Sequence, residues 1–326
     1  MAGIWNPAMK VTAQAQPNIA LVKYWGKRDL ARNLPAVSSL SITLDSLWTR
    51  MSVSFGSAGT DSLEVNGAVA PTMLERVGRC LDLVVGSERE YAQVVSESNF
   101  PIGAGLASSA SAFAALVVAA DEAAGSGRDT LTLARLAGAA SGSAARSLYG
   151  GIVELTAGID EIDLRNLAER DEWPLEVVVA VTEKSQKPVG SGDAMVRGAG
   201  TSPFYPSWIE RQDEDMKSAR IAVAERDFAS LAEIAEHNCL KMHSVMWTSR
   251  PPIVYWNKAT LGCLEMVRSL RADGHSVFFT IDAGPQVKAV CLPESADDVE
   301  AALSAIDGVI ETMRSGLGSG ARIIAT

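Results

Sequence analysis

The stretch Asn99-Phe-Pro-Ile-Gly-Ala-Gly-Leu-Ala-Ser-Ser-Ala-Ser111 places two glycines between a proline and a group of serines. Pro101 interrupts regular structure, and Gly103 and Gly105 permit a tight turn and a close approach of the backbone to a ligand. The Ala-rich residues 112–124 then favour a helix. Because a helix start presents unpaired N–H groups and a positive dipole end, it suits a phosphate. The stretch alone has two interpretations, a serine N-cap on a buried helix or a phosphate site.

Two common nucleotide motifs are missing from the chain. The sequence contains neither Gly-x-x-x-x-Gly-Lys-Ser/Thr nor Gly-x-Gly-x-x-Gly. A nucleotide bound at residues 99–111 therefore implies a fold other than the P-loop or dinucleotide-binding folds.

Length and composition indicate a globular protein. The 326 residues are enough for two domains, and 47% hydrophobic and 21% charged residues are typical of a soluble chain. A formal net charge of -10 disfavours nucleic acid or an anionic membrane as the main partner. No hydrophobic signal segment and no apolar run of about 18 residues occur, so we expect a cytoplasmic protein.

Cysteine and histidine usage excludes several kinds of site. The four cysteines are scattered and form no Cys-x-x-Cys pair, which disfavours a zinc site or a disulfide framework. With only three histidines, a His-rich metal site or a Ser-His-Asp triad is not expected.

The hydrophobic pattern predicts a mixed helix and strand chain with a domain boundary near residues 184–190. Apolar positions at helical spacing predict helices at 71–85, 112–124, 130–140, 190–199, 207–224, 227–247, 255–272 and 295–306. Short alternating or apolar runs predict strands at 10–16, 41–44, 49–55, 61–65, 91–97, 152–155, 175–182, 276–281, 286–292, 309–313 and 322–325. We expect the strands at 41–44 and 49–55 to be joined by a short turn, and Asn66-Gly67 to close a hairpin.

Three further polar clusters interrupt this pattern. Residues 17–27 carry Lys23 and Lys27, which suit phosphate, or else form a solvated strand edge. Residues 141–146 bring serines and Arg146 together, for an anion clamp or for an arginine paired with a surface acid. Asp282, at an expected strand end, is either a reactive carboxylate or a turn residue.

Together the clusters resemble the diphosphomevalonate decarboxylases of the GHMP kinase superfamily. Asn18 to Lys27, Gly105 to Ser111, Ser141 to Gly151, the segment from His243 to Tyr255, and Asp282-Ala-Gly-Pro285 occur in that family's order. The resemblance implies an α+β fold with a ribosomal protein S5-like N-terminal domain, residues 1–186. An α/β C-terminal domain, residues 187–326, would follow, with the active site in the cleft between the two.

The resemblance also implies the reaction. ATP and Mg²⁺ would drive decarboxylation of 5-diphosphomevalonate to isopentenyl diphosphate, releasing ADP, phosphate and CO₂, in the mevalonate pathway of isoprenoid biosynthesis. It further implies a homodimer.

Site residues follow from the same resemblance. Asp282 would orient or deprotonate the 3-hydroxyl, Arg146 would face the substrate carboxylate, and Lys23 would neutralise phosphate charge. The ATP-binding residues would be Ser96, Asn99, Gly103, Ala104, Gly105, Leu106, Ala107, Ser108 and Ser109, with Ser108 also near Mg²⁺. The substrate-binding residues would be Asn18, Tyr24, Trp25, Gly26, Lys27, Ser141, Gly142, Ser143, Ala144, Ala145, Arg146 and Ser191.

Two positions depart from the family pattern. Many members carry an Arg or Thr that touches the diphosphate where this chain has Gly192, and an Arg where Ala68 follows Asn66-Gly67. Both changes remove contacts to the distal phosphate, so a monophosphate substrate is an alternative. Two further alternatives are a mevalonate 3-kinase, which has no need of Asp282, and a non-catalytic metabolite sensor, which would be expected to lack Lys23, Arg146 and Asp282.

Overall fold

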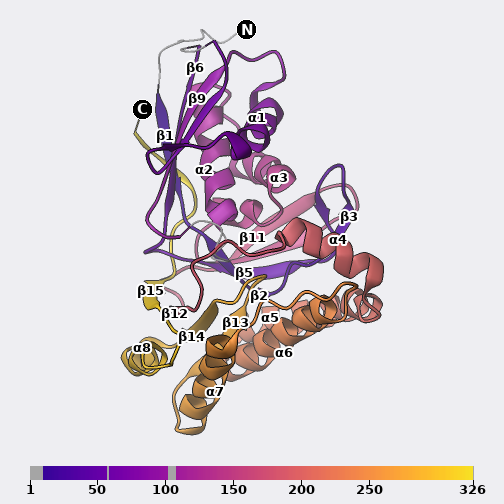
Figure 1. Cartoon of the computed structure of the whole chain (residues 1–326), viewed down its shortest axis with the longest axis vertical. Coiled ribbons are helices and arrows are strands. Elements are labelled where there is room, and N and C mark those ends of the chain that lie inside the picture. Colours follow the sequence, from indigo (N-terminus) through magenta and orange to yellow (C-terminus); the bar gives the residue numbers. More distant parts are fainter. Residues whose placement is uncertain (1–9, 57–58, 102–107, 326) are drawn as a thin grey trace.

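The computed structural model describes residues 10–56, 59–101 and 108–325. The chain forms two stacked parts (Figure 1), with α1, α2 and α3 in the first and α5, α6 and α7 in the second. A six-stranded sheet belongs to the first part, one four-stranded sheet belongs to the second, and another four-stranded sheet lies between them.

A six-stranded sheet forms the outer layer of the first part. Its strand order is β16-β1-β6-β9-β7-β8. The bounds are Arg322–Ala325 (β16), Val11–Ala15 (β1), Thr49–Phe55 (β6), Ala92–Ser98 (β9), Ser62–Val65 (β7) and Ala68–Val69 (β8). The strict alternation of β6 buries Met51, Val53 and Phe55 on one face of the sheet, and α2 packs against that strand.

Three helices cover this sheet on one side (Figure 1). They are α1 (Pro71–Val85), α2 (Ser108–Ala123) and α3 (Thr130–Ala140). The small side chains of α2 are buried almost all round the helix, so it lies at the centre of the domain with Ser108 and Ser109 at its first turn. The predicted helices at 71–85 and 130–140 are confirmed, and the helix predicted at 112–124 begins four residues earlier.

A four-stranded sheet lies between the two parts. Its order is β11 (Ile162–Ala168), β10 (Ile152–Ala157), β5 (Ser39–Thr43) and β2 (Asn18–Val22). The short helix η1 (Ala144–Leu148) packs against β5 and β10, while α5 (Tyr205–Glu225) packs against β2, β5 and β11, and α6 (Phe228–Trp247) packs against β2. The hairpin of β3 (Lys27–Asp29) and β4 (Leu34–Pro35) stands apart as a two-stranded unit.

The third sheet has the order β13-β14-β12-β15. Its antiparallel strands are Val277–Ile281 (β13), Val287–Cys291 (β14), Glu176–Val181 (β12) and Glu311–Gly316 (β15). Helices α6, α7 (Lys258–Ala272) and α8 (Ala296–Ser304) pack on it, α8 following the short η2 (Pro293–Ser295). Helix α4 (Ser191–Thr201) packs against α6 beside the cleft described below.

The strands predicted at 41–44 and 49–55 are present as β5 and β6 and are joined by the short segment 44–48, although they lie in different sheets. Two other sequence expectations need correction. The division at residue 186/187 places β12 in the first domain, yet β12 pairs with β14 and β15, and β16 returns to pair with β1. Strand β11 was not expected, because its alternation of buried and exposed residues is broken by polar Asn166.

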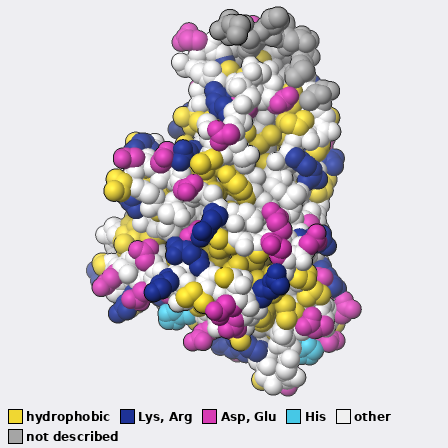
Figure 2. Space-filling model, turned by 180° about the vertical axis from the view of Figure 1, so that it is seen from behind, with side chains coloured by type: hydrophobic (Ala, Val, Ile, Leu, Met, Phe, Trp, Pro, Cys, Tyr) yellow, Lys and Arg dark blue, Asp and Glu magenta, His cyan; other side chains and the backbone are white. Residues whose placement is uncertain are grey.

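The surface of the described residues is mixed in charge. Acidic and basic side chains are interspersed on the face shown in Figure 2. Within the same residues, none of the helices is long and apolar enough to cross a membrane.

Candidate active site

A cleft of 1210 Å³ brings the predicted clusters together. Its walls include the segment that follows β2, the first turns of α2 and α4, the loop before η1, and the residues just after β13. The predicted site residues that line it are Asn18, Lys23, Tyr24, Trp25, Lys27, Ser108, Ser109, Ser141, Gly142, Ser143, Arg146, Ser191 and Asp282. Segments far apart in the sequence thus face one volume, and the ion pair of Lys23 and Asp282 joins two residues 259 positions apart.

Asp282 sits between two lysines. Lys23 Nζ donates to Asp282 Oδ1 at 2.7 Å, and Lys288 Nζ lies 3.4 Å from Oδ2. Both lysine side chains are 1% exposed, whereas the Asp282 side chain keeps 23% exposure towards the cleft. Burial by itself raises the pKa of Asp282, but Lys23 and Lys288 outweigh it and hold the pKa of this carboxyl well below its usual range.

This electrostatic setting limits the chemistry of Asp282. A carboxylate with a strongly lowered pKa stays ionised and has little affinity for a proton. Of the two roles expected from the sequence, orienting a substrate hydroxyl therefore suits Asp282 better than deprotonating it.

A buried polar network fixes the main chain of Lys23. Its N–H donates to Asn238 Oδ1 at 2.7 Å, and its carbonyl accepts from Gln212 Nε2 at 2.8 Å. Asn238 Nδ2 also donates to Gln212 Oε1 at 3.0 Å, and both amides are fully buried. Helices α5 and α6 thus position the lysine that pairs with Asp282.

Arg146 is held as a rigid fork in η1. Its Nε and one terminal nitrogen donate to Asn18 Oδ1 at 3.2 and 3.0 Å, and the other terminal nitrogen donates to Ser39 Oγ at 2.7 Å. Asn18 is oriented in turn by donating to the Ser143 carbonyl and to Ser147 Oγ. Burial lowers the pKa of Arg146 to about 10, with Asp282 and Tyr24 opposing the shift, so the side chain remains a cation at neutral pH.

Tyr24 presents a hydroxyl donor at the same wall. Its Oη is buried and has no hydrogen-bond partner among the residues described, and burial raises its pKa to about 12. A Cβ on Gly142 would lie 2.4 Å from this oxygen, so glycine is needed there for Tyr24 to occupy its place. A neutral phenol beside Arg146 suits a donor to an anionic oxygen.

Several predicted site residues lie elsewhere. Asn99 is not among the described lining residues, because its side chain bonds the Trp48 N–H and the Ser46 carbonyl. Ser96 is paired within β9, and Ala144 and Ala145 are buried in the core of the first domain. At Gly26, φ is +93° and a Cβ would meet Tyr205 Oη at 2.2 Å, so this residue makes a turn behind the cleft.

The central part of the opening stretch falls outside the described residues. This applies to Gly103, Ala104, Gly105, Leu106 and Ala107. Ser108 and Ser109 do line the cleft at the start of α2. Because these two serines lie at a helix N-terminus, phosphate binding by this stretch stays a proposal.

Two lysines were missed from the sequence. Lys187, in the loop expected to be a linker, donates to Ser191 Oγ at 2.6 Å and to the Ala283 carbonyl at 2.8 Å. Burial and the nearby Lys288 lower its pKa to about 8, although Asp282 opposes the shift. The sequence does contain a sign of the role of Lys288, because a lysine inside an apolar run such as Val287–Cys291 is rarely buried without a charged partner.

The donor set of the cleft suits an anionic ligand. Lys23, Lys187 and Arg146 supply positive charge, and the α2 start supplies hydroxyls and a positive dipole end. The described residues contain no group of three or more His, Cys, Asp or Glu arranged to hold a metal ion. A magnesium ion here would therefore be coordinated largely by phosphate oxygens, with Ser108 as the expected hydroxyl near it.

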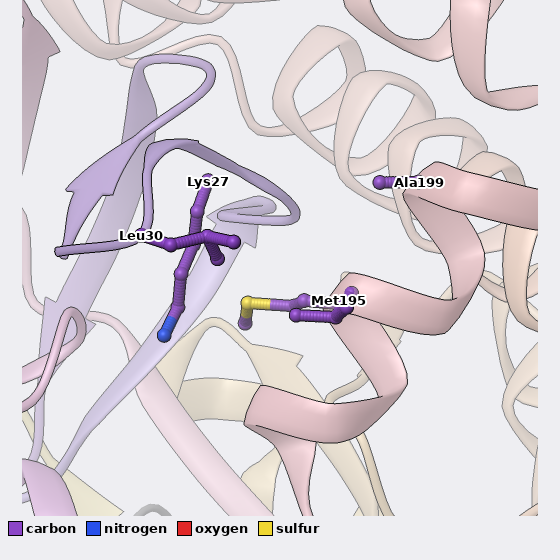
Figure 3. A pocket seen from close by; sticks show the side chains of 5 residues that line it. Lys27, Leu30, Met195 and Ala199 are labelled. Carbon is purple, nitrogen blue, oxygen red and sulfur yellow. The ribbon is translucent and has the colours of Figure 1, made fainter.

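A smaller pocket of 150 Å³ opens beside the cleft. Figure 3 shows Lys27 and Leu30, from the β3 hairpin, facing Met195 of α4 across it. Because these three residues also line the main cleft, the pocket continues the entrance of the same site.

Sequence comparisons agree with this geometry. The diphosphomevalonate decarboxylase-like N-terminal domain matches residues 15–166, and the mevalonate 5-diphosphate decarboxylase C-terminal domain matches residues 177–317. The diphosphomevalonate decarboxylase of Aspergillus fumigatus is 34% identical over 326 residues, covering 92% of this chain and 81% of its own. The Homo sapiens enzyme of the same name is 32% identical, covering 91% and 80%.

Solved structures agree as well. The protein called MDDEF, in complex with MVAPP, AMPPCP and magnesium, has a TM-score of 0.91 at 34% identity, covering 98% of this chain and 99% of its own. Mevalonate diphosphate decarboxylase from Staphylococcus aureus has a TM-score of 0.90 at 34% identity, covering 97% and 98%. The expected two-domain α+β GHMP kinase fold is thereby confirmed. This chain belongs to the diphosphomevalonate decarboxylase family.

Proposed function

We propose that this protein catalyses the ATP-dependent decarboxylation of 5-diphosphomevalonate to isopentenyl diphosphate, ADP, phosphate and CO₂. The observation that carries the proposal is the ionised Asp282, paired with Lys23 at 2.7 Å in a cleft that Arg146, Ser108 and Ser109 also line. Relatives with this name and a neighbour solved with MVAPP, AMPPCP and magnesium support the same reaction.

Each side chain of the cleft has a role that matches its charge. Arg146 binds the substrate carboxylate through its remaining N–H groups, and Tyr24 donates to an anionic oxygen of the same ligand. Ser108, Ser109 and Lys187 hold the phosphates of ATP, which with Mg²⁺ supplies the phosphoryl group that makes the tertiary hydroxyl a leaving group. Asp282 orients that hydroxyl and then lies opposite the positive charge that develops at C3.

A monophosphate substrate is the second candidate, supported by one feature of the cleft. Gly192 lines it without a side chain, and a Cβ there would meet no atom within 4 Å. The departure from the family pattern at Ala68 does not support a monophosphate substrate, because Ala68 lies on the exposed strand β8 and is not among the described residues that line the cleft.

One assay separates these functions. ADP and CO₂ release are measured in parallel on mevalonate, its 5-phosphate and its 5-diphosphate. We expect the diphosphate to give both products with the highest kcat/KM. A preference for the monophosphate would establish the second candidate, ADP without CO₂ would indicate a 3-kinase, and inactivity on all three would refute the decarboxylase proposal. Sedimentation of the purified chain tests the homodimer that the resemblance predicts.

Lys187 should set an alkaline limit on activity. With its pKa lowered to about 8, the ammonium is charged below that pH and neutral above it. Because a charged Lys187 favours phosphate binding, we expect kcat/KM to fall about tenfold per pH unit above pH 8, as for loss of one proton from the free enzyme. The pH profile of kcat/KM measures this.

Arginine variants identify the titrating group. Lys187→Arg keeps its charge at high pH, so the alkaline limb should move upward. Lys27→Arg is the matched control, and it should leave the limb in place. A limb that moves with Lys27→Arg and not with Lys187→Arg would show that Lys27 is the group responsible, since burial and Arg76 lower the pKa of Lys27 as well.

A further inference from the structure

Lys288 is a buried lysine that the reaction as described does not use. It is the second residue of β14, an otherwise apolar strand, and it is not among the described residues that line the cleft. An ammonium removed from water is strongly disfavoured unless an opposite charge compensates it. One negatively charged partner is Asp282, whose Oδ2 lies 3.4 Å from Lys288 Nζ.

The hairpin register explains why the two side chains meet. Lys288 is opposite Thr280 in the β13–β14 ladder, and Asp282 follows Thr280 by two residues. Because alternate residues share a face of a strand, Thr280, Asp282 and Lys288 point to the same side of the sheet. Thr280 Oγ1 donates to the Ala20 carbonyl at 3.2 Å, so this side faces β2 and the Lys23 segment.

Asp282 is therefore held from two directions. Lys23 reaches Oδ1 from the chain after β2, and Lys288 reaches Oδ2 from within the third sheet. The carboxylate is thus hydrogen-bonded through Oδ1 to a lysine from the first part of the molecule and ion-paired through Oδ2 with a lysine from the second. Lys23 lines the cleft and Lys288 is not among the described residues that line it, so the contact of Lys288 with Asp282 is the route by which we expect it to act on a bound ligand.

Other charged or titratable groups also face Asp282. Lys187 donates to the carbonyl of the next residue, Ala283, and Arg146 lies across the cleft. From α6, His243 Nε2 lies 3.2 Å from the Ile281 carbonyl, and Cys239 Sγ lies 3.5 Å from it. Burial lowers the pKa of His243 to about 3, so that ring is neutral near pH 7. Lys288 is thus the cation that contacts Asp282 from the side away from the ligand.

We propose that Lys288 is a positioning residue for the reaction, holding the Asp282 carboxylate in place and ionised when the phosphates of the substrates are bound beside it. This inference rests on the proposed function. Anionic phosphates raise the proton affinity of a nearby carboxylate, and a cation behind it opposes that effect. Burial lowers the pKa of Lys288 itself, and the negative charge of Asp282 opposes that shift. Lys23 lines the cleft in which we propose that the phosphates bind, whereas Lys288 is not among the described residues that line it.

The test replaces the charge and keeps the length of the side chain. For Lys288→Met we expect kcat near pH 7 to fall about 10- to 100-fold, with KM for both substrates changed less than about threefold. Removing a cation from within 4 Å of a carboxylate raises its pKa, so the acid limb of the kcat profile should lie at least about one pH unit higher than in the parent protein. Lys288→Arg should keep the parent limb.

Three controls isolate the role of Lys288. In an Asp282→Asn background, Lys288→Met should cause no further loss of kcat, because the carboxylate it acts on is gone. Glu154→Gln removes a buried carboxylate, 3% exposed and paired with Arg165 and Arg220 away from the cleft, and should lower Tm without moving the acid limb. The ¹³Cγ shift of Asp282 during a pH titration reports its pKa without turnover.

The outcomes are distinct. An active parent protein whose acid limb and Asp282 shift are unchanged by Lys288→Met would overturn the positioning role and leave the proposed function standing. A parent protein inactive on all three mevalonates would refute the proposed function, and the ¹³C titration would still decide whether Lys288 controls Asp282. If Lys288→Met does not fold, Lys288→Gln and Lys288→Arg in the same titration give the answer.

Discussion

Asp282→Asn should lower kcat by at least about 10²-fold, the scale seen when one preorganised electrostatic group is removed from an active site. Asparagine keeps the shape of the side chain and an oxygen for Lys23, but it has no negative charge. The hydroxyl loses its acceptor, and the positive charge that develops at C3 loses its counter-charge. KM for ATP should change little, because Asp282 lies at the end of β13 and not at the α2 start.

Product analysis shows at which step Asp282 acts. ADP and CO₂ release should fall together, since the hydroxyl must be oriented before phosphoryl transfer. Loss of CO₂ with ADP retained would restrict Asp282 to the decarboxylation step, and near-normal turnover would contradict its assignment altogether. The variant leaves Lys23 and Lys288 without their shared anion, so a lower Tm is also expected and should be recorded beside the kinetics.

The structure also predicts whether protonation of Asp282 is visible in the pH profile of the parent protein. Because Lys23 and Lys288 hold its pKa well below the usual range, the parent protein should show no acid limb from this group between about pH 5 and pH 7. A limb in that window that disappears in Asp282→Asn would instead favour the general-base role.

The sequence predicted the central residues of the site through the order of its motifs. Lys23, Arg146 and Asp282 line one cleft as expected, although no local pattern links positions so far apart. The local sequence pattern does not predict which residues of a motif point into the cleft. Ala144 and Ala145 lie in a predicted motif, yet they face the core while Ser143 and Arg146 face the cleft.

The remaining errors arose from interactions that sequence spacing does not encode. Lys187 occupies a polar loop that resembles any linker, and its role depends on the distant Ala283 carbonyl. Strand β12 is an apolar run that fits either sheet, and only its pairing with β14 and β15 assigns it. Lys288 meets Asp282 because of the register of one hairpin, which depends on the turn between them.

Arg146→Lys should lower kcat/KM for the mevalonate ester by about 10²-fold or more, since losing one partner of a buried, hydrogen-bonded charge costs about 2–5 kcal/mol. Arg146 is 2% exposed, and three of its five N–H groups are used by Asn18 and Ser39. The other two can bind a carboxylate only while this fork is held flat. A lysine has one ammonium, which cannot satisfy both neighbours and the ligand.

Arg146→Lys should change the kinetic parameters for the mevalonate ester and not those for ATP. We expect KM for the mevalonate ester to rise or kcat to fall, with KM for ATP within about threefold of the parent value, because Arg146 contacts the wall formed by Asn18 and Ser39. Arg165→Lys is the matched control, as this arginine is 66% exposed and pairs with Glu154 outside the cleft, so its kcat/KM should stay within about twofold. If Arg146→Lys retained the parent kcat/KM while Asp282→Asn did not, the substrate carboxylate would have to bind to other donors that line the cleft, such as Tyr24 and Lys27.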